Sequence, residues 1–163
     1  MGGWEVMQLL NSPLEVGVRV VALLSALYPA GADLTRIVLL DHLILHSGDF
    51  SEEMSLHPKV PGRVGELGVK RQLVSEGISL MGARGLIVPE YSVAGIAYVA
   101  GDDARPFLSS INSLYLADLQ RRCEWAAREF SAVDDDAIRS RLGDVFGHWA
   151  VEFEQIVRQD NDE

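Results

Sequence analysis

The segment spanning residues 63–107 constrains the fold of this 163-residue chain more than any other part of it. Residues 63–81 carry apolar side chains at helical spacing, and two short apolar runs follow at 86–88 and 95–99, separated by a turn region at 89–94. A helix followed directly by a two-stranded hairpin is the core of a winged helix. The sequence therefore predicts a mainly α-helical fold, with three helices, a β-hairpin wing and a C-terminal helical extension.

Two further helices are expected before this segment. Ser12, Pro13 and Glu15 form a helix-start pattern that predicts a helix over residues 13–28, and Asp33 begins a second helix that reaches about residue 46. Apolar side chains occupy nearly every side of both segments, and a helix that is apolar all round must be buried all round. We expect this to exceed what one small core can cover, so that part of the surface faces another subunit.

Eight apolar residues are the predicted partner contacts. They lie on the three N-terminal helices and on the last helix of the chain: Val20, Leu24, Leu40, Val69, Leu73, Leu80, Trp149 and Phe153.

The helix over residues 63–81 would read DNA if this were a DNA-binding winged helix. On a helical wheel, its two apolar stripes leave a side made of glycine, serine, glutamine and glutamate, with no basic residue. Arg71 falls within the first stripe and Lys70 lies beside it. The pattern predicts a helix that packs on both sides and contacts protein rather than DNA.

The rest of the chain is expected to be helical. Asp102 or Asp103 precedes a short helix with Pro106 in its first turn, and Ser113 precedes a helix to about residue 130. Asp134 starts a last helix, whose apolar stripe continues to Val157. We expect a winged-helix-like core in residues 1–110 and C-terminal helices in residues 111–163, packed together as one domain.

Charge argues against free-standing DNA binding. The net charge is −10, and an acidic body repels a phosphate backbone at long range. Basic residues exceed acidic ones only in residues 59–85. Their side chains are the possible nucleic-acid contacts: Lys59, Arg63, Lys70, Arg71 and Arg84.

No residue pattern predicts catalysis, a cofactor or a metal. His42 and His46 have the spacing of a zinc pair but lack the glutamate of a metalloprotease, so an interface or a hydrogen-bonded polar strip is the preferred interpretation. Asp134, Asp135 and Asp136 are interpreted as helix capping rather than as a cation site. Cys123 is the single cysteine, and we interpret it as a packed thiol.

The expected compartment is the cytoplasm. The N-terminus lacks a basic leader with a cleavage site, and the two most apolar runs, residues 16–28 and 34–45, are shorter than the roughly 20 residues of a membrane span. We therefore predict no membrane partner.

Several ordered segments resemble a known family. They are NSPLEVGVRVVALLSALYP, DLTRIVLLDHLILHSGDF, SLHPKVPGRVGELGVKRQLVSEGISLMGARGLI, the hairpin, and AGDDARPFLSSI. Together they cover about residues 9–130 and resemble the middle-component family of bacterial ABC-three-component systems, best known from Lamassu-type antiphage defence.

The resemblance implies a small non-catalytic adaptor, similar to the winged-helix accessory subunits of chromosome-maintenance ATPases. Such a subunit would sit between an SMC-like ABC ATPase that senses DNA and an effector such as a nuclease, so that DNA is contacted indirectly through the complex. It carries over no residue with a fixed role. The alternative that the basic segment leaves open is a winged-helix transcription regulator that binds DNA itself.

Overall fold

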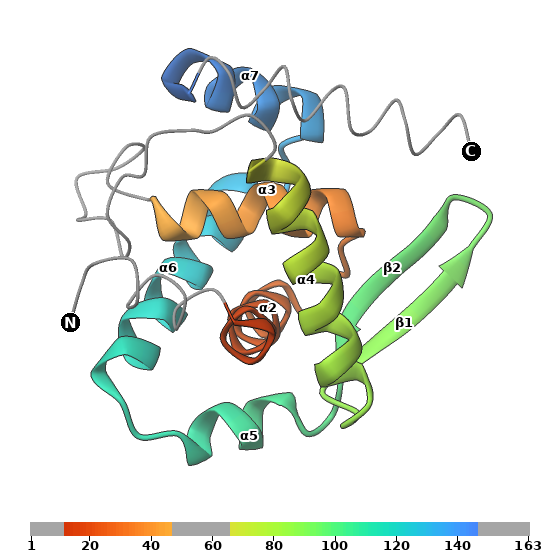
Figure 1. The fold of residues 1–163 in the computed structure, drawn as a ribbon, viewed down its shortest axis with the longest axis vertical. Helices are drawn as coiled ribbons and strands as arrows, with labels where there is room; N and C mark the ends of the chain where they lie inside the picture. The colour runs from red at the N-terminus through yellow and green to blue at the C-terminus, as the bar shows by residue number, and fades with distance from the viewer. Residues whose placement is uncertain (1–11, 47–65, 147–163) are drawn as a thin grey trace.

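The computed structural model describes residues 12–46 and 66–146 of the chain. In this part the elements follow one another as α2 (Pro13–Leu27), α3 (Leu34–Leu45), α4 (Glu66–Gly82), β1 (Ile87–Ser92), β2 (Gly95–Ala100), α5 (Ala104–Ser110), α6 (Leu114–Phe130) and α7 (Asp135–Phe146). Figure 1 shows α2 at the centre, with α3, α4, α5 and α6 around it and the hairpin projecting to one side.

Side-chain caps begin four of these helices where the sequence predicts a start. Each cap oxygen accepts a hydrogen bond from the backbone N–H three residues later: Ser12 at 3.2 Å, Asp33 at 2.8 Å, Ser113 at 2.9 Å and Asp134 at 2.7 Å. Such bonds satisfy N–H groups that have no partner within the helix. Asp103 occupies the same position before α5 but makes no side-chain cap bond.

The helix α2 packs most closely against α4. A methyl group added at Gly77 of α4 would lie 2.8 Å from the backbone nitrogen of Gly17 in α2, so the two backbones touch where they cross. Beyond this crossing, Met81 packs its side chain over Gly17. Glycine at both positions is what allows this close approach.

Most of the apolar surface that we expect α2 and α3 to leave for another subunit is buried within the chain, whereas Leu14 of α2 is 57% exposed. The prediction that Val20, Leu24 and Leu40 contact a partner is wrong, because these side chains are 0–1% exposed. The reason is that α6 and α5 close on the sides of α2 that α4 leaves open, and α6 and α7 pack on α3. The packing of these later helices on α2 and α3 has no signal in the sequence of α2 and α3 themselves.

The hairpin completes a winged helix. β1 and β2 pair antiparallel, and Ala32, between α2 and α3, forms a single bridge with Tyr98 on the outer edge of β2. Three helices, a strand-like residue between the first two, and a β-hairpin are the parts of a winged-helix core. The mainly α-helical winged-helix fold is thus confirmed. We call the hairpin, Ile87–Ala100, the wing.

The wing is longer than predicted, because β1 continues through Pro89 to Ser92 and only Val93 and Ala94 remain in the turn. Tyr98, the partner of Pro89, directs its N–H and carbonyl to Ala32 and therefore away from β1. The Pro89–Tyr98 pair is thus a pair without hydrogen bonds between the strands, where the missing N–H of proline breaks no bond.

Arg36 of α3 holds the C-terminal helices on the core. Its guanidinium donates to Asp135 Oδ1 at 2.9 Å and to the carbonyl oxygen of Phe130. These contacts fix the corner between α6 and α7 against α3. The division of the chain at residue 110 stays a prediction.

No helix within the described ranges is long and apolar enough to cross a membrane.

Candidate functional site

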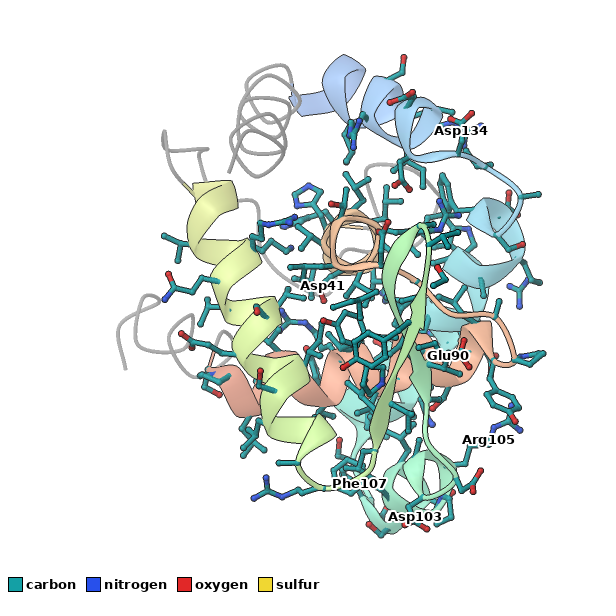
Figure 2. The ribbon with its side chains drawn as sticks, turned by 90° about the vertical axis from the view of Figure 1, so that its right-hand side faces the viewer. Asp41, Glu90, Asp103, Arg105, Phe107 and Asp134 are labelled. Atoms are coloured by element: carbon teal, nitrogen blue, oxygen red, sulfur yellow. The ribbon has the colours of Figure 1, made fainter. Side chains whose placement is uncertain are left out.

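Three charged side chains meet between α2, α3 and α4, and we call them the buried charge cluster: Arg19, Asp41 and Lys70. Arg19 donates through Nε to Asp41 Oδ1 at 2.9 Å and through Nη2 to Oδ2 at 3.2 Å. Lys70 Nζ lies 3.1 Å from Asp41 Oδ2. Arg19 and Asp41 are each only 2% exposed and Lys70 is 15% exposed. Figure 2 shows Asp41 between α3 and α4.

The pKa values of this cluster follow from burial and from the opposite charges. Burial alone would raise the pKa of Asp41, but the charges of Arg19 and Lys70, together with their hydrogen bonds, hold it well below its usual range. Burial lowers the pKa of Lys70, and Asp41 opposes that shift. Asp41 is therefore ionised at neutral pH and supplies the negative charge that both cations need.

The two basic residues of α4 are turned away from the surface that would face DNA. Lys70 is directed at Asp41, and Arg71 donates to the Thr35 hydroxyl at 3.2 Å. Arg84 is exposed at the end of α4, where it donates to the carbonyl of Leu80, while Lys59 and Arg63 lie outside the described residues. The described residues of the predicted nucleic-acid patch are thus not brought together on one surface.

The outward side of α4 has the composition that the helical wheel predicted. Gln72, Ser75, Glu76 and Ser79 are exposed, and the Gln72 amide donates to Glu76 at 3.3 Å. This side offers no positive charge to a phosphate backbone.

The candidate metal and thiol residues lie in or beside the core, where His42 and Cys123 are buried and His46 is half-buried. The rings of His42 and His46 lie 4.6 Å apart, and burial, with help from Lys70 and His46, lowers the pKa of His42 well below its ordinary value. Within residues 12–46 and 66–146, no three His, Cys, Asp or Glu side chains gather as metal ligands. Burial raises the pKa of the Cys123 thiol, which keeps it protonated and unreactive.

The three neighbouring aspartates act in capping and ion pairing. Asp134 caps α7, Asp135 pairs with Arg36, and Asp136 pairs with Arg139 at 2.9 Å. This agrees with the capping interpretation.

The wing carries the most distinctive exposed surface of the described residues. Four of its large apolar side chains are exposed: Val88, Tyr91, Val93 and Ile96. Tyr91 is 76% exposed and Val93, at the tip, is fully exposed. Large apolar groups clustered on one protruding element are typical of a protein-contact surface.

The wing itself carries one charge, that of Glu90 on β1. The charges near its base are mixed, because Arg84 precedes β1 and Asp102, Asp103 and Arg105 follow β2. Figure 2 shows Glu90 on the hairpin and Asp103 near its base. The wing therefore offers no cation to a phosphate backbone.

The predicted partner contacts are scattered in the structure. Val69 is exposed on α4, Leu73 and Leu80 are half-buried there, and Trp149 and Phe153 lie outside the described residues. Their partner-binding role stays a prediction.

Sequence reasoning missed the wing residues. Cross-strand partners share a face, so Pro89 with Tyr98 and Tyr91 with Ile96 make one wing face entirely apolar as far as the tip. That signal was present in the sequence, but it becomes visible only once the register is known.

The family model of ABC-three component (ABC-3C) system Middle Component 2 matches the chain over residues 9–152. Comparison with curated proteins gives no match, and neither does comparison with solved structures. The family match covers most of the chain. The chain therefore belongs to the family of ABC-three component system Middle Component 2.

Proposed function

We propose that this protein is the non-catalytic adaptor of a cytoplasmic antiphage defence complex of the Lamassu type. It holds an SMC-like ABC ATPase and an effector such as a nuclease in one assembly. Family membership supports a place among the components of an ABC-three-component system. The finer role rests on which surfaces the winged helix exposes.

The observation that carries the proposal is the inward orientation of the basic residues of α4. Lys70 is used by Asp41 and Arg71 by Thr35, while the outward side of the helix is neutral or acidic. Phosphate contacts from lysine and arginine supply most of the affinity of a DNA-binding protein. A winged helix whose α4 exposes no lysine or arginine on its outward side is poorly suited to the alternative role of a transcription regulator. It is better suited to contact protein.

The test is reconstitution with the products of the neighbouring genes. We expect the effector to co-elute with the ATPase on size-exclusion chromatography only when this chain is present. If the effector and the ATPase associate equally well without it, the adaptor role is wrong.

DNA binding provides a second readout. We expect the isolated chain to bind a duplex of about 30 base pairs far more weakly than the complex does, with a salt slope close to zero. Binding by the isolated chain that equals the complex in affinity and salt slope would instead support the transcription regulator.

A further inference from the structure

We propose that the wing inserts into an apolar groove with a basic rim on another protein subunit of the same complex, with Tyr91 and Val93 as its anchors. This inference rests on the proposed adaptor function and names the element that makes one of its contacts.

The wing is a narrow finger with apolar groups on both faces. Tyr91 and Ile96 face each other across the strands on one side, while Val88 is exposed on the other. The chain turns sharply at Val93 and Ala94, where Gly95 adopts a φ of +119° that favours glycine. The tip therefore presents Val93 at the end of a short, well-defined turn.

The edges of the wing are unsuited to strand addition. On β2, Tyr98 already exchanges both backbone hydrogen bonds with Ala32, at 2.8 and 3.0 Å. On β1, Pro89 lies at the position whose N–H would point outward, and proline has none. A strand added by a partner could not form a full set of backbone hydrogen bonds on either edge. We therefore expect side chains of the wing to make the contact.

The size of the wing argues for a groove rather than a flat surface or a second wing. The wing exposes four large apolar side chains, split over two faces, which are few beside the roughly 20–30 residues that each partner contributes to a standard interface. A flat surface would cover only one face of the finger. A groove covers both faces and the tip, and it buries Tyr91, the kind of residue that anchors interfaces.

Charge selects the rim of that groove. Glu90 is the one charged residue of the wing, while Asp102 and Asp103 at its base are flanked by Arg84 and Arg105. A lysine or arginine of the groove placed against Glu90 would complement its carboxylate and speed association. A wing with no basic residue also offers nothing to the phosphates of a nucleic acid.

The test compares two surface variants in the reconstituted complex. Tyr91→Ser combined with Val93→Ser should weaken binding of this chain to its partner by about tenfold or more. Leu114→Ser is the matched control, because Leu114 is 92% exposed at the start of α6, and it should change binding less than about twofold. Unchanged binding by the double variant overturns the inference.

Cross-linking identifies the occupant independently of affinity. Val93→Cys, labelled with a maleimide benzophenone, carries a single reactive thiol because Cys123 is completely buried. On irradiation of the complex, we expect cross-links to a peptide of another subunit that contains apolar residues and lysine or arginine, as mass spectrometry would show. Cross-links to a second copy of this chain, to DNA, or to no subunit overturn the inference.

The outcomes separate this inference from the adaptor proposal. If the wild-type chain forms no complex with the neighbouring gene products, the adaptor proposal fails and the wing contact fails with it. If the complex forms and tolerates the wing variants, only the wing contact is wrong.

Discussion

The buried charge cluster and the wing invert the usual distribution of residues in a small protein. Between α2, α3 and α4, Arg19, Asp41 and Lys70 lie almost out of contact with solvent. On the wing, large apolar side chains such as Tyr91 and Val93 stand in solvent. Burying charge and exposing apolar groups are both unfavourable for an isolated chain.

The difference shows that the two regions serve different ends. In the cluster, Asp41 lies between Arg19 and Lys70 and pairs with both, so these side chains fix the orientation of α4 against α2 and α3. The wing has no such compensation within the described residues, which is why we assign it to a partner. Substitutions in the two regions test this separation between a region that supports folding and a region that supports binding.

The largest effect is expected from Asp41→Ala. This change leaves Arg19 and Lys70 charged and without Asp41 in a buried site, and should lower the free energy of unfolding by about 3–5 kcal/mol. Urea denaturation measures it. Asp136→Ala, which breaks a pair whose carboxylate is 89% exposed, is the control and should cost about 0–1 kcal/mol. Equal effects of the two variants would mean that the buried cluster does not support the fold.

The crossing of α2 and α4 should show the next largest effect. A Cβ in Gly77→Ala would approach the Gly17 nitrogen to 2.8 Å and the Pro13 carbonyl oxygen to 3.1 Å, so the helices must separate. We expect a loss of about 1–3 kcal/mol in the free energy of unfolding. Gly82→Ala, whose nearest neighbour would be 3.7 Å away, should be neutral or slightly stabilising. Stabilisation by Gly77→Ala would contradict the close packing.

His42 gives the buried region a pH dependence. Its pKa is lowered in the folded state, so between that value and the ordinary histidine pKa the unfolded chain binds the extra proton. Stability should therefore fall as pH drops from 7 to 5, by up to about 1.4 kcal/mol per pH unit. The groups facing His42 are Lys70, His46 and Asp41, and Asp41 titrates below this window.

The matched variant for this effect is His42→Gln, which cannot titrate. Denaturation curves at several pH values should show a shallower dependence for the variant than for the wild type. Parallel dependences would exclude His42 as the source.

The smallest effect on stability is expected in the wing. Tyr91→Ala removes a mostly exposed ring and should change the free energy of unfolding of the isolated chain by no more than about 0.5 kcal/mol. Ile87→Ala, on the same face of β1 but fully buried, should cost about 2–5 kcal/mol. A large destabilisation by Tyr91→Ala would mean that the ring stabilises the fold itself.

Local signals in the sequence were sufficient for the helix starts and for the inward basic residues. The caps at Ser12, Asp33 and Ser113 depend on hydrogen bonds within three residues, which a sequence pattern can predict. The placement of Lys70 and Arg71 away from the open side of α4 follows from helical periodicity alone. Their partners, Asp41 and Thr35, could not be named because they come from another helix.

The position of Pro89 in the wing could not be predicted from the sequence. The sequence pattern places Pro89 in the turn region at residues 89–94, whereas the structure places it in β1. It is accommodated in β1 because its nitrogen faces the outer edge, a fact that depends on the bridge between Tyr98 and Ala32. A contact between residues so far apart in sequence has no local signature.

The sequence by itself determined where helices begin, which side of α4 is apolar, and that the wing region carries no basic charge, because these properties depend on neighbouring residues. Only the tertiary structure decided that α2 and α3 are largely covered from within the chain and that residues 12–46 and 66–146 leave the wing exposed. Burial depends on which distant segments pack together, and α6 returns to α2 from about a hundred residues away along the chain.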